Sequence, residues 1–172
     1  MMKNLPSQAI VIGFIVLSTF SNAFAVDPTM LAMEGGRLSA DEAQSLEKKL
    51  EQEPGDTASR IKLLGYYFRQ SYSNQNARDS KRKHVLWFIT TSPESEVLSS
   101  LYGMLDAITD PEGYSKGKTA WKTNIEKDPQ NLVYLRHSAE YFKMHDRALA
   151  IESFQTARSL DADNPLWSER LG

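Results

Sequence analysis

Residues 147–164, RALAIESFQTARSLDADN, repeat the pattern of residues 114–131, YSKGKTAWKTNIEKDPQN. At a constant offset of 33 positions, a small residue precedes a large aromatic one by four positions: Gly117 and Trp121, then Ala150 and Phe154. The small residue lets a neighbouring helix approach closely, and the large side chain fills the space beside it. The repeat therefore predicts two equivalent helices, each followed by an Asp/Asn-rich turn.

Apolar residues at spacings of three and four predict helices along the rest of the chain as well. The first begins at a capping box formed by Ser39 and Glu42 and ends at Pro54-Gly55. Further apolar stripes predict helices at 61–68, 85–89, 98–108, 117–125, 135–142 and 150–160, with the start of another at 164–172. No segment alternates as a strand does. The prediction is an all-α fold in which short loops make successive helices antiparallel neighbours.

The first 25 residues have the order of parts of a secretory signal peptide. Lys3 precedes an apolar run from Ala9 to Phe20, and the small-x-small triplet Ala23-Phe24-Ala25 follows it. We expect cleavage after Ala25 and an exported protein, periplasmic or secreted. An uncleaved membrane anchor is the alternative, although so short an apolar run does not cross a bilayer comfortably as a helix.

The remaining chain is expected to form one domain behind a short leader. Residues 26–37 contain Pro28 and the pair Gly35-Gly36 without any periodicity, which indicates a flexible leader. Residues 38–172 are enough for a single domain with a sizeable core.

The composition excludes several classes of function. The formal net charge is −2, with acidic and basic residues mixed, so the chain lacks the basic surface that nucleic acids and anionic membranes require. There is no cysteine, which excludes disulfides, thiolate metal sites, a cysteine nucleophile and a lipid-anchoring cysteine. No phosphate-binding, dinucleotide-binding or serine-hydrolase motif is present. We therefore predict no enzyme activity, no cofactor and no membrane partner after signal removal.

The remaining polar motifs favour structural interpretations. The histidines lack the paired spacing of zinc hydrolases, so we expect no metal site and surface or partly packed side chains for His84, His137 and His145. The basic run at 79–84 is expected to be a solvated helix face. The Asp/Asn-rich segment 161–164 lacks the glycine and the spacing of a calcium loop, so we interpret it as a helix-capping turn.

Residues 131–164 resemble a tetratricopeptide repeat (TPR). Ala150 and Phe154 match the small-x-x-x-aromatic signature of the second helix of that repeat, and Ala157 follows three positions on. In the first helix, Ala139 and Phe142 fit, whereas Ser138 stands where leucine is usual. The segment 61–68, IKLLGYYF, matches the opening pattern of the family with two conservative changes. The resemblance extends over about residues 56–172.

The resemblance implies antiparallel helix pairs stacked as a short TPR-like solenoid, about three repeats with a leading and a trailing helix. It also implies a concave face that binds a peptide or a helix of another protein. The positions that would line this groove are Lys62, Tyr66, Arg69, Tyr102, Asp106, Arg136, Glu140 and Lys143, beside Ser59, Ser99, Thr109 and Val133. These residues are alternatively no more than the polar faces of their helices. A second functional interpretation is an accessory subunit of an envelope enzyme or transport complex that docks through its C-terminal end.

The C-terminal segment 164–172, NPLWSERLG, looks like half of a further repeat. A solenoid end needs a cap, so Trp167 and Leu171 are predicted to form a terminal lid or an interface. Three interpretations remain open: a lid formed by this chain, completion by self-association or a partner, and a chain shorter than its relatives. We favour the lid, with Trp167 sealing the end.

Overall fold

The computed structural model describes residues 27–171, and all regular structure within them is helical. This part of the chain has two 3₁₀ segments, η1 (Glu96–Ser99) and η2 (Leu101–Gly103), and no β-strand, which confirms the all-α prediction. Its eight α-helices are α1 (Pro28–Gly35), α2 (Ala40–Gln52), α3 (Thr57–Gln70), α4 (Gln75–Thr91), α5 (Pro111–Lys127), α6 (Leu132–Phe142), α7 (Arg147–Leu160) and α8 (Pro165–Leu171).

The predicted signal segment, residues 1–25, lies outside the part of the chain that the structure describes. Among the helices at 27–171, none combines the length and the apolar character needed to cross a bilayer. The described chain starts at Asp27, whose carboxylate accepts a hydrogen bond from the backbone N–H of Thr29 and caps α1.

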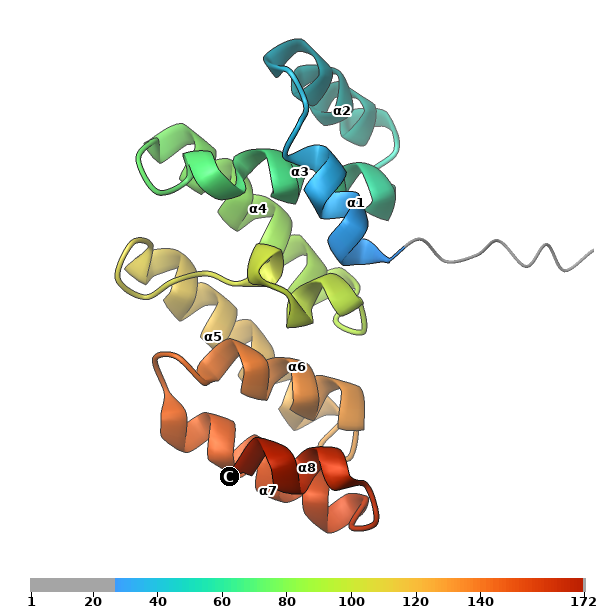
Figure 1. The fold of residues 1–172 in the computed structure, drawn as a ribbon, viewed down its shortest axis with the longest axis vertical. Coiled ribbons are helices and arrows are strands. Elements are labelled where there is room, and N and C mark those ends of the chain that lie inside the picture. Colours follow the sequence, from blue (N-terminus) through green and yellow to red (C-terminus); the bar gives the residue numbers. More distant parts are fainter. Residues whose placement is uncertain (1–26, 172) are drawn as a thin grey trace, which may run out of the picture.

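The helices from α2 to α7 follow one another along the longest axis of the molecule in the order of the sequence, and α8 packs against α7 (Figure 1). Helices α4 and α5 pack together although the 3₁₀ segments separate them in the sequence. The central core contains Phe88, Trp121 and Phe142, all with buried side chains. A second apolar cluster joins α6, α7 and α8 around Phe154 and Trp167.

Four turns share one backbone geometry and divide the stack into similar units. At each turn, the residue that follows the preceding helix has φ between −143° and −122° and ψ between 57° and 78°. Its carbonyl accepts a hydrogen bond from the N–H three residues later, in the pairs Glu53/Asp56, Ser92/Ser95, Asp128/Asn131 and Asp161/Asn164.

The last two of these turns also share their side-chain contacts. Asn131 accepts hydrogen bonds from the first turn of α6, and its amide donates to Asp128 Oδ2 at 3.0 Å. Asn164 accepts from the N–H of Leu166, and its amide donates to Asp161 Oδ2 at 2.9 Å. The repeat found in the sequence at these positions is therefore a repeat of capping geometry.

The expectation of a flexible leader at 26–37 is wrong, because α1 occupies most of this segment and packs along α3. A Cβ atom on Gly65 of α3 would lie 1.7 Å from the carbonyl oxygen of Ala32. A Cβ atom on Gly35 of α1 would lie 1.9 Å from the carbonyl oxygen of Lys62. The backbones of the two helices therefore touch. A glycine pair is typical of loops, but here Gly35 serves close helix packing.

The helix expected at 98–108 does not form either, and η1, η2 and an irregular segment take its place. Leu98 and Leu105 are buried, as the apolar stripe predicts. Leu101 and Ile108, from the same stripe, are 68 % and 83 % exposed. Half of the stripe therefore contributes to the core, while the other half lies on the surface.

Two local features explain this departure from the predicted helix. A Cβ atom on Gly103 would lie 2.4 Å from the carbonyl oxygen of Val97, so the chain folds back on itself at a distance that only glycine allows. The carboxylate of Asp106 accepts hydrogen bonds from the N–H groups of Ile108 and Thr109. Such side-chain bonds compete with the helical pattern of backbone hydrogen bonds.

A buried polar network around His84 holds α2 against α3 and α4. Its ring nitrogens lie 2.8 Å from Glu47 Oε1 and 3.2 Å from Arg60 Nη1. Because a guanidinium can only donate, we assign Nδ1 as the acceptor from Arg60 and Nε2 as the donor to Glu47. The Tyr67 hydroxyl also donates to Glu47, at 3.1 Å. His84 is fully buried, which corrects the expectation of a surface or partly packed side chain.

The Glu47 carboxylate should make the stability of the fold depend on pH. Burial alone would raise its pKa, but the hydrogen bond from His84 and the charge of Lys83 lower the pKa from 4.5 to about 2. A carboxylate with a lowered folded-state pKa stabilises the fold above its unfolded pKa, and this contribution is lost as the pH falls through the folded pKa. We therefore expect Glu47→Gln to lower the free energy of unfolding near neutral pH, and the deficit to shrink as the pH falls from 4.5 toward 2.

Urea unfolding of both proteins across this pH range measures the deficit. Glu51→Gln is the matched control, since Glu51 is exposed on the same helix. A deficit that stays constant with pH would contradict the role given to Glu47.

Candidate binding groove

The eight residues predicted to line a groove fall into two groups. Five line two adjoining pockets: Tyr66, Arg69 and Tyr102 in the smaller, Asp106 and Lys143 in the larger. The other three line neither pocket: Lys62, Arg136 and Glu140.

These three side chains connect neighbouring elements instead. Lys62 forms an ion pair of 3.4 Å with a glutamate of α1. Arg136 of α6 pairs with Glu96 of η1. Glu140 of α6 is buried and pairs with Arg170 of α8 at 3.1 Å. The prediction assumed that no other element covers these positions of the stacked helices. In the structure, α1, η1 and α8 contact them.

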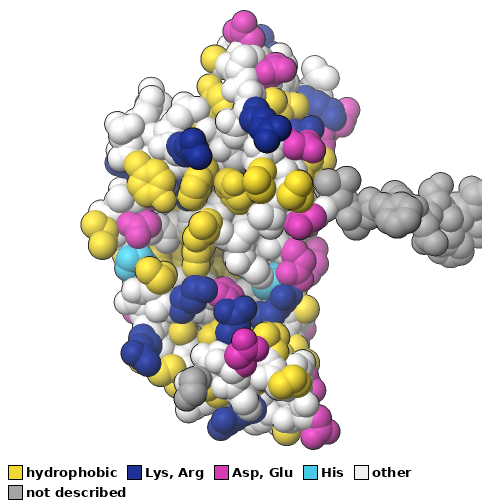
Figure 2. Space-filling model, in the orientation of Figure 1, with side chains coloured by type: hydrophobic (Ala, Val, Ile, Leu, Met, Phe, Trp, Pro, Cys, Tyr) yellow, Lys and Arg dark blue, Asp and Glu magenta, His cyan; other side chains and the backbone are white. Residues whose placement is uncertain are grey.

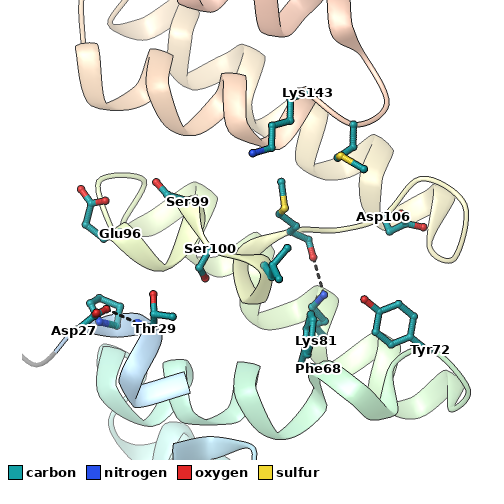
Figure 3. Close-up of a pocket in the computed structure, with 14 residues that line it drawn as sticks. Asp27, Thr29, Phe68, Tyr72, Lys81, Glu96, Ser99, Ser100, Asp106 and Lys143 are labelled. Carbon is teal, nitrogen blue, oxygen red and sulfur yellow. Dashed lines mark hydrogen bonds between the residues drawn. The ribbon is translucent and has the colours of Figure 1, made fainter. Parts of the chain in front are cut away.

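The larger pocket has a volume of about 870 Å³ and opens beside the 3₁₀ segments (Figure 3). Its walls come from the start of α1, the C-terminal ends of α3 and α6, helix α4 and the segment at 96–106. Apolar and aromatic side chains form much of the surface: Phe68, Tyr72, Leu101, Met104 and Met144. The charged residues that line it are Asp27, Lys81, Glu96, Asp106 and Lys143.

The smaller pocket, of about 530 Å³, continues the larger one along α3. Phe68 lines both, and its ring centroid lies 5.0 Å from that of Tyr102, which lines only the smaller pocket. Arg37 and Arg69 lie at the smaller pocket. Together the two pockets form a groove, which we call the inner groove, with an aromatic centre and two arginines at the α1–α3 end.

Large apolar side chains are exposed around the inner groove. In the view of Figure 1, α1, α6 and α8 lie in front, and the same side in Figure 2 shows a row of hydrophobic side chains with Lys and Arg above and below it. The large apolar and aromatic side chains that line the groove and are about half or more exposed are Met33 (48 %), Tyr72 (57 %), Leu101 (68 %) and Met144 (70 %).

At one edge of the groove, His145 and Asp106 join the α6–α7 turn to the segment before α5. His145 Nε2 lies 3.0 Å from Asp106 Oδ2. Burial would raise the pKa of Asp106, but hydrogen bonds from Thr109 and His145 lower it below its usual value. Asp106 therefore carries its negative charge while it lines the larger pocket.

The basic run at 79–84 is only partly a solvated face, which corrects the expectation. Lys81 is buried, and Arg82 donates to the buried Asp110 carboxylate at 2.9 Å, whereas Lys83 is exposed.

His137 is also fully buried, contrary to expectation, with Nδ1 2.9 Å from the carbonyl oxygen of Pro93. Burial lowers the pKa of His137, which favours the neutral ring.

The residue of the groove that sequence reasoning missed most clearly is Lys81. It follows Ala77 by four positions and precedes Val85 by four, so it interrupts the apolar stripe of its own helix. A lysine within an apolar stripe was a signal that could have indicated a buried ammonium group. Phe68, Tyr72, Met104 and Met144 carried no such signal, because their exposure depends on the irregular segment.

Within residues 27–171, no group of three His, Cys, Asp or Glu side chains is arranged to hold a metal ion. The chain has no significant match among protein-family models, among curated proteins or among solved structures. The inner groove is thus the feature from which a function can be inferred.

Proposed function

We propose that this chain is an exported interaction module of TPR-like architecture that binds a peptide or a helix of another protein in the inner groove. The observation that carries the proposal is the gathering of exposed methionine, leucine and aromatic side chains around two adjoining pockets. Soluble monomers rarely leave large apolar patches exposed unless the patches bind something. Aromatic residues and methionine are also enriched in protein interfaces.

The repeated turns support the TPR-like part of the proposal. Turns of one geometry follow α2, α4, α5 and α7, so the chain from α3 onward divides into units of two segments each. In the middle unit the 3₁₀ segments stand where the other units have their first helix. This irregular unit would widen the groove of a regular solenoid.

The C-terminal end is the less favoured docking surface. Trp167 is buried there, and Leu171 packs against the same apolar cluster. Such packing supports the inner groove over an accessory subunit that docks through α8.

Photocrosslinking should identify the partner at the groove. A benzophenone amino acid in place of Met144 should crosslink the partner in the cells that produce the protein. Leu101→Glu, introduced into the same labelled protein, should lower the yield of crosslinked product about tenfold or more, because a charge in the apolar centre of an interface removes a principal contact. The products would be identified by mass spectrometry.

Two control positions make this test specific. Thr119 of α5 and Gln155 of α7 are exposed and line neither pocket. Equal capture from these positions, or capture that Leu101→Glu leaves unchanged, would contradict the groove as the binding site.

The export part of the proposal requires that the protein purified from its own cells begins at Val26.

A further inference from the structure

Lys81 of α4 carries a charge that no ion pair balances within residues 27–171. The residue is only 8 % exposed, and its Nζ donates to the carbonyl oxygen of Met104 at 2.7 Å (Figure 3). The Phe68 ring lies beneath it, with the centroid 5.1 Å from Nζ. An ammonium group has three N–H donors, so this site leaves two of them without a carbonyl or carboxylate partner in this part of the chain.

The other charged groups that line the larger pocket are already engaged. Asp27 caps α1, and the remaining partners come from α6 and the turn after it. The pairs are Glu96 with Arg136, Asp106 with His145, and Lys143 with Glu140. A negative group that enters the pocket would therefore find Lys81 as its unpaired cation.

A buried, unpaired ammonium group is costly unless an anion joins it. Burial lowers the pKa of Lys81 to about 8, although the charges of Asp106 and Asp110 act in the opposite direction. Neither of these carboxylates forms an ion pair with Lys81, since Asp106 is bound to His145 and Asp110 to Arg82. A carboxylate on Nζ would replace lost hydration with charge-assisted hydrogen bonds.

A second polar group of the same pocket also lacks a partner. The hydroxyl oxygen of Ser99 is buried and makes no hydrogen bond within the described chain. Buried hydroxyl groups are normally hydrogen-bonded in folded proteins. Ser99 and Lys81 belong to different elements, η1 and α4, yet both line the pocket and both have unused donors.

We propose that the larger pocket binds a ligand in which a carboxylate is joined to an apolar chain, with the carboxylate on Lys81. The apolar part would lie against Phe68, Leu101, Met104 and Met144. The volume is in the range of ligand pockets that combine apolar walls with a few polar groups. A free fatty acid and the apolar C-terminus of a peptide share this chemistry. The inference goes beyond the proposed function and does not depend on it, because a free acid needs no protein partner.

Calorimetry with matched acidic and neutral probes tests this site. The probes are decanoate with decanol, and acetyl-Ala-Phe-Leu-Leu with its C-terminal amide. At least one acid should bind about tenfold or more tightly than its neutral counterpart, the effect of one charge-assisted hydrogen bond. Lys81→Met should abolish this preference, whereas Lys83→Met, a change at an exposed lysine of the same helix, should leave it intact.

The two probe pairs also distinguish the sources of the carboxylate. A preference for decanoate alone assigns the site to free acids, and a preference for the peptide acid alone assigns it to a chain terminus. Either result supports the site. Acids that bind no better than their neutral counterparts, or a preference that survives Lys81→Met, would overturn it. These outcomes are independent of the crosslinking result, so this inference and the proposed function can fail separately.

The pH dependence keeps the test decisive if Lys81→Met does not fold. Both acids are ionised throughout the neutral and alkaline range, while Lys81 loses its proton as the pH rises through about 8. The preference for the acids should therefore hold near neutral pH and fall as the pH rises through about 8. A flat profile would overturn the pairing with Lys81. The other titratable groups that line the larger pocket are Asp27, Tyr72, Glu96, Asp106 and Lys143. Arg78 and Asp110 line a separate small cavity that Lys81 also borders.

Discussion

Gly65→Ala is expected to lower the free energy of unfolding by about 2–3 kcal/mol, the cost of overpacking a tight contact. The added methyl group would lie 1.7 Å from the carbonyl oxygen of Ala32, so α1 and α3 must separate to admit it. In an isolated helix the same change would stabilise by about 1 kcal/mol, because glycine is a poor helix former. The sign of the effect thus reports the contact between the two helices.

Urea unfolding measures this change, and Gly55→Ala provides the control. No atom lies within 4 Å of a Cβ atom placed on Gly55, so its replacement should change stability by less than about 0.5 kcal/mol. Limited proteolysis should also cleave the Gly65→Ala protein sooner between α1 and α2, since α1 no longer packs closely against α3. A Gly65→Ala protein as stable as the original would mean that α1 does not rest on α3.

Helix α1 shows why part of this fold escaped prediction from the sequence. Its eight residues are too few for a helix that is stable alone, and they carry no wide apolar stripe. What holds α1 is its backbone contact with α3, through Gly65 in another part of the chain. The helices with long apolar stripes, such as α5 and α7, needed no such distant information and were predicted correctly.

In the irregular segment at 96–109, the prediction failed in the opposite way. An apolar stripe with helical spacing predicted a helix there, but no α-helix forms. Leu98 and Leu105 are buried although no α-helix forms, because Gly103 and Asp106 direct the local backbone otherwise. Tyr102 and Asp106, which regular repeats predict to line a groove, do line pockets in the structure, but the shape of these pockets was not predicted. The pocket results from the missing helix, which periodicity could not reveal, whereas the apolar stripe of α4 did carry a signal for the burial of Lys81.

Trp167→Ala is expected to lower the free energy of unfolding by about 3–4 kcal/mol, as for other buried aromatic side chains. Trp167 is 3 % exposed and packs in the apolar cluster of α6, α7 and α8, which includes Phe154 and Ala157. Its indole N–H donates to Asp161 Oδ2 at 3.2 Å. A helix as short as α8 has little stability of its own, so the loss of this anchor should release it from α6 and α7.

The same measurement decides between a lid formed by one chain and an end completed by a second copy. Ser168→Ala, a change at the exposed neighbour, is the control and should alter stability by less than about 0.5 kcal/mol. If α8 is a lid, light scattering gives a monomer, and the loss caused by Trp167→Ala is the same at every protein concentration. If a second copy completes the end, the stability of the unchanged protein rises with concentration by mass action. Trp167 would then contribute to an interface, and its replacement should lower the molar mass as well as the stability.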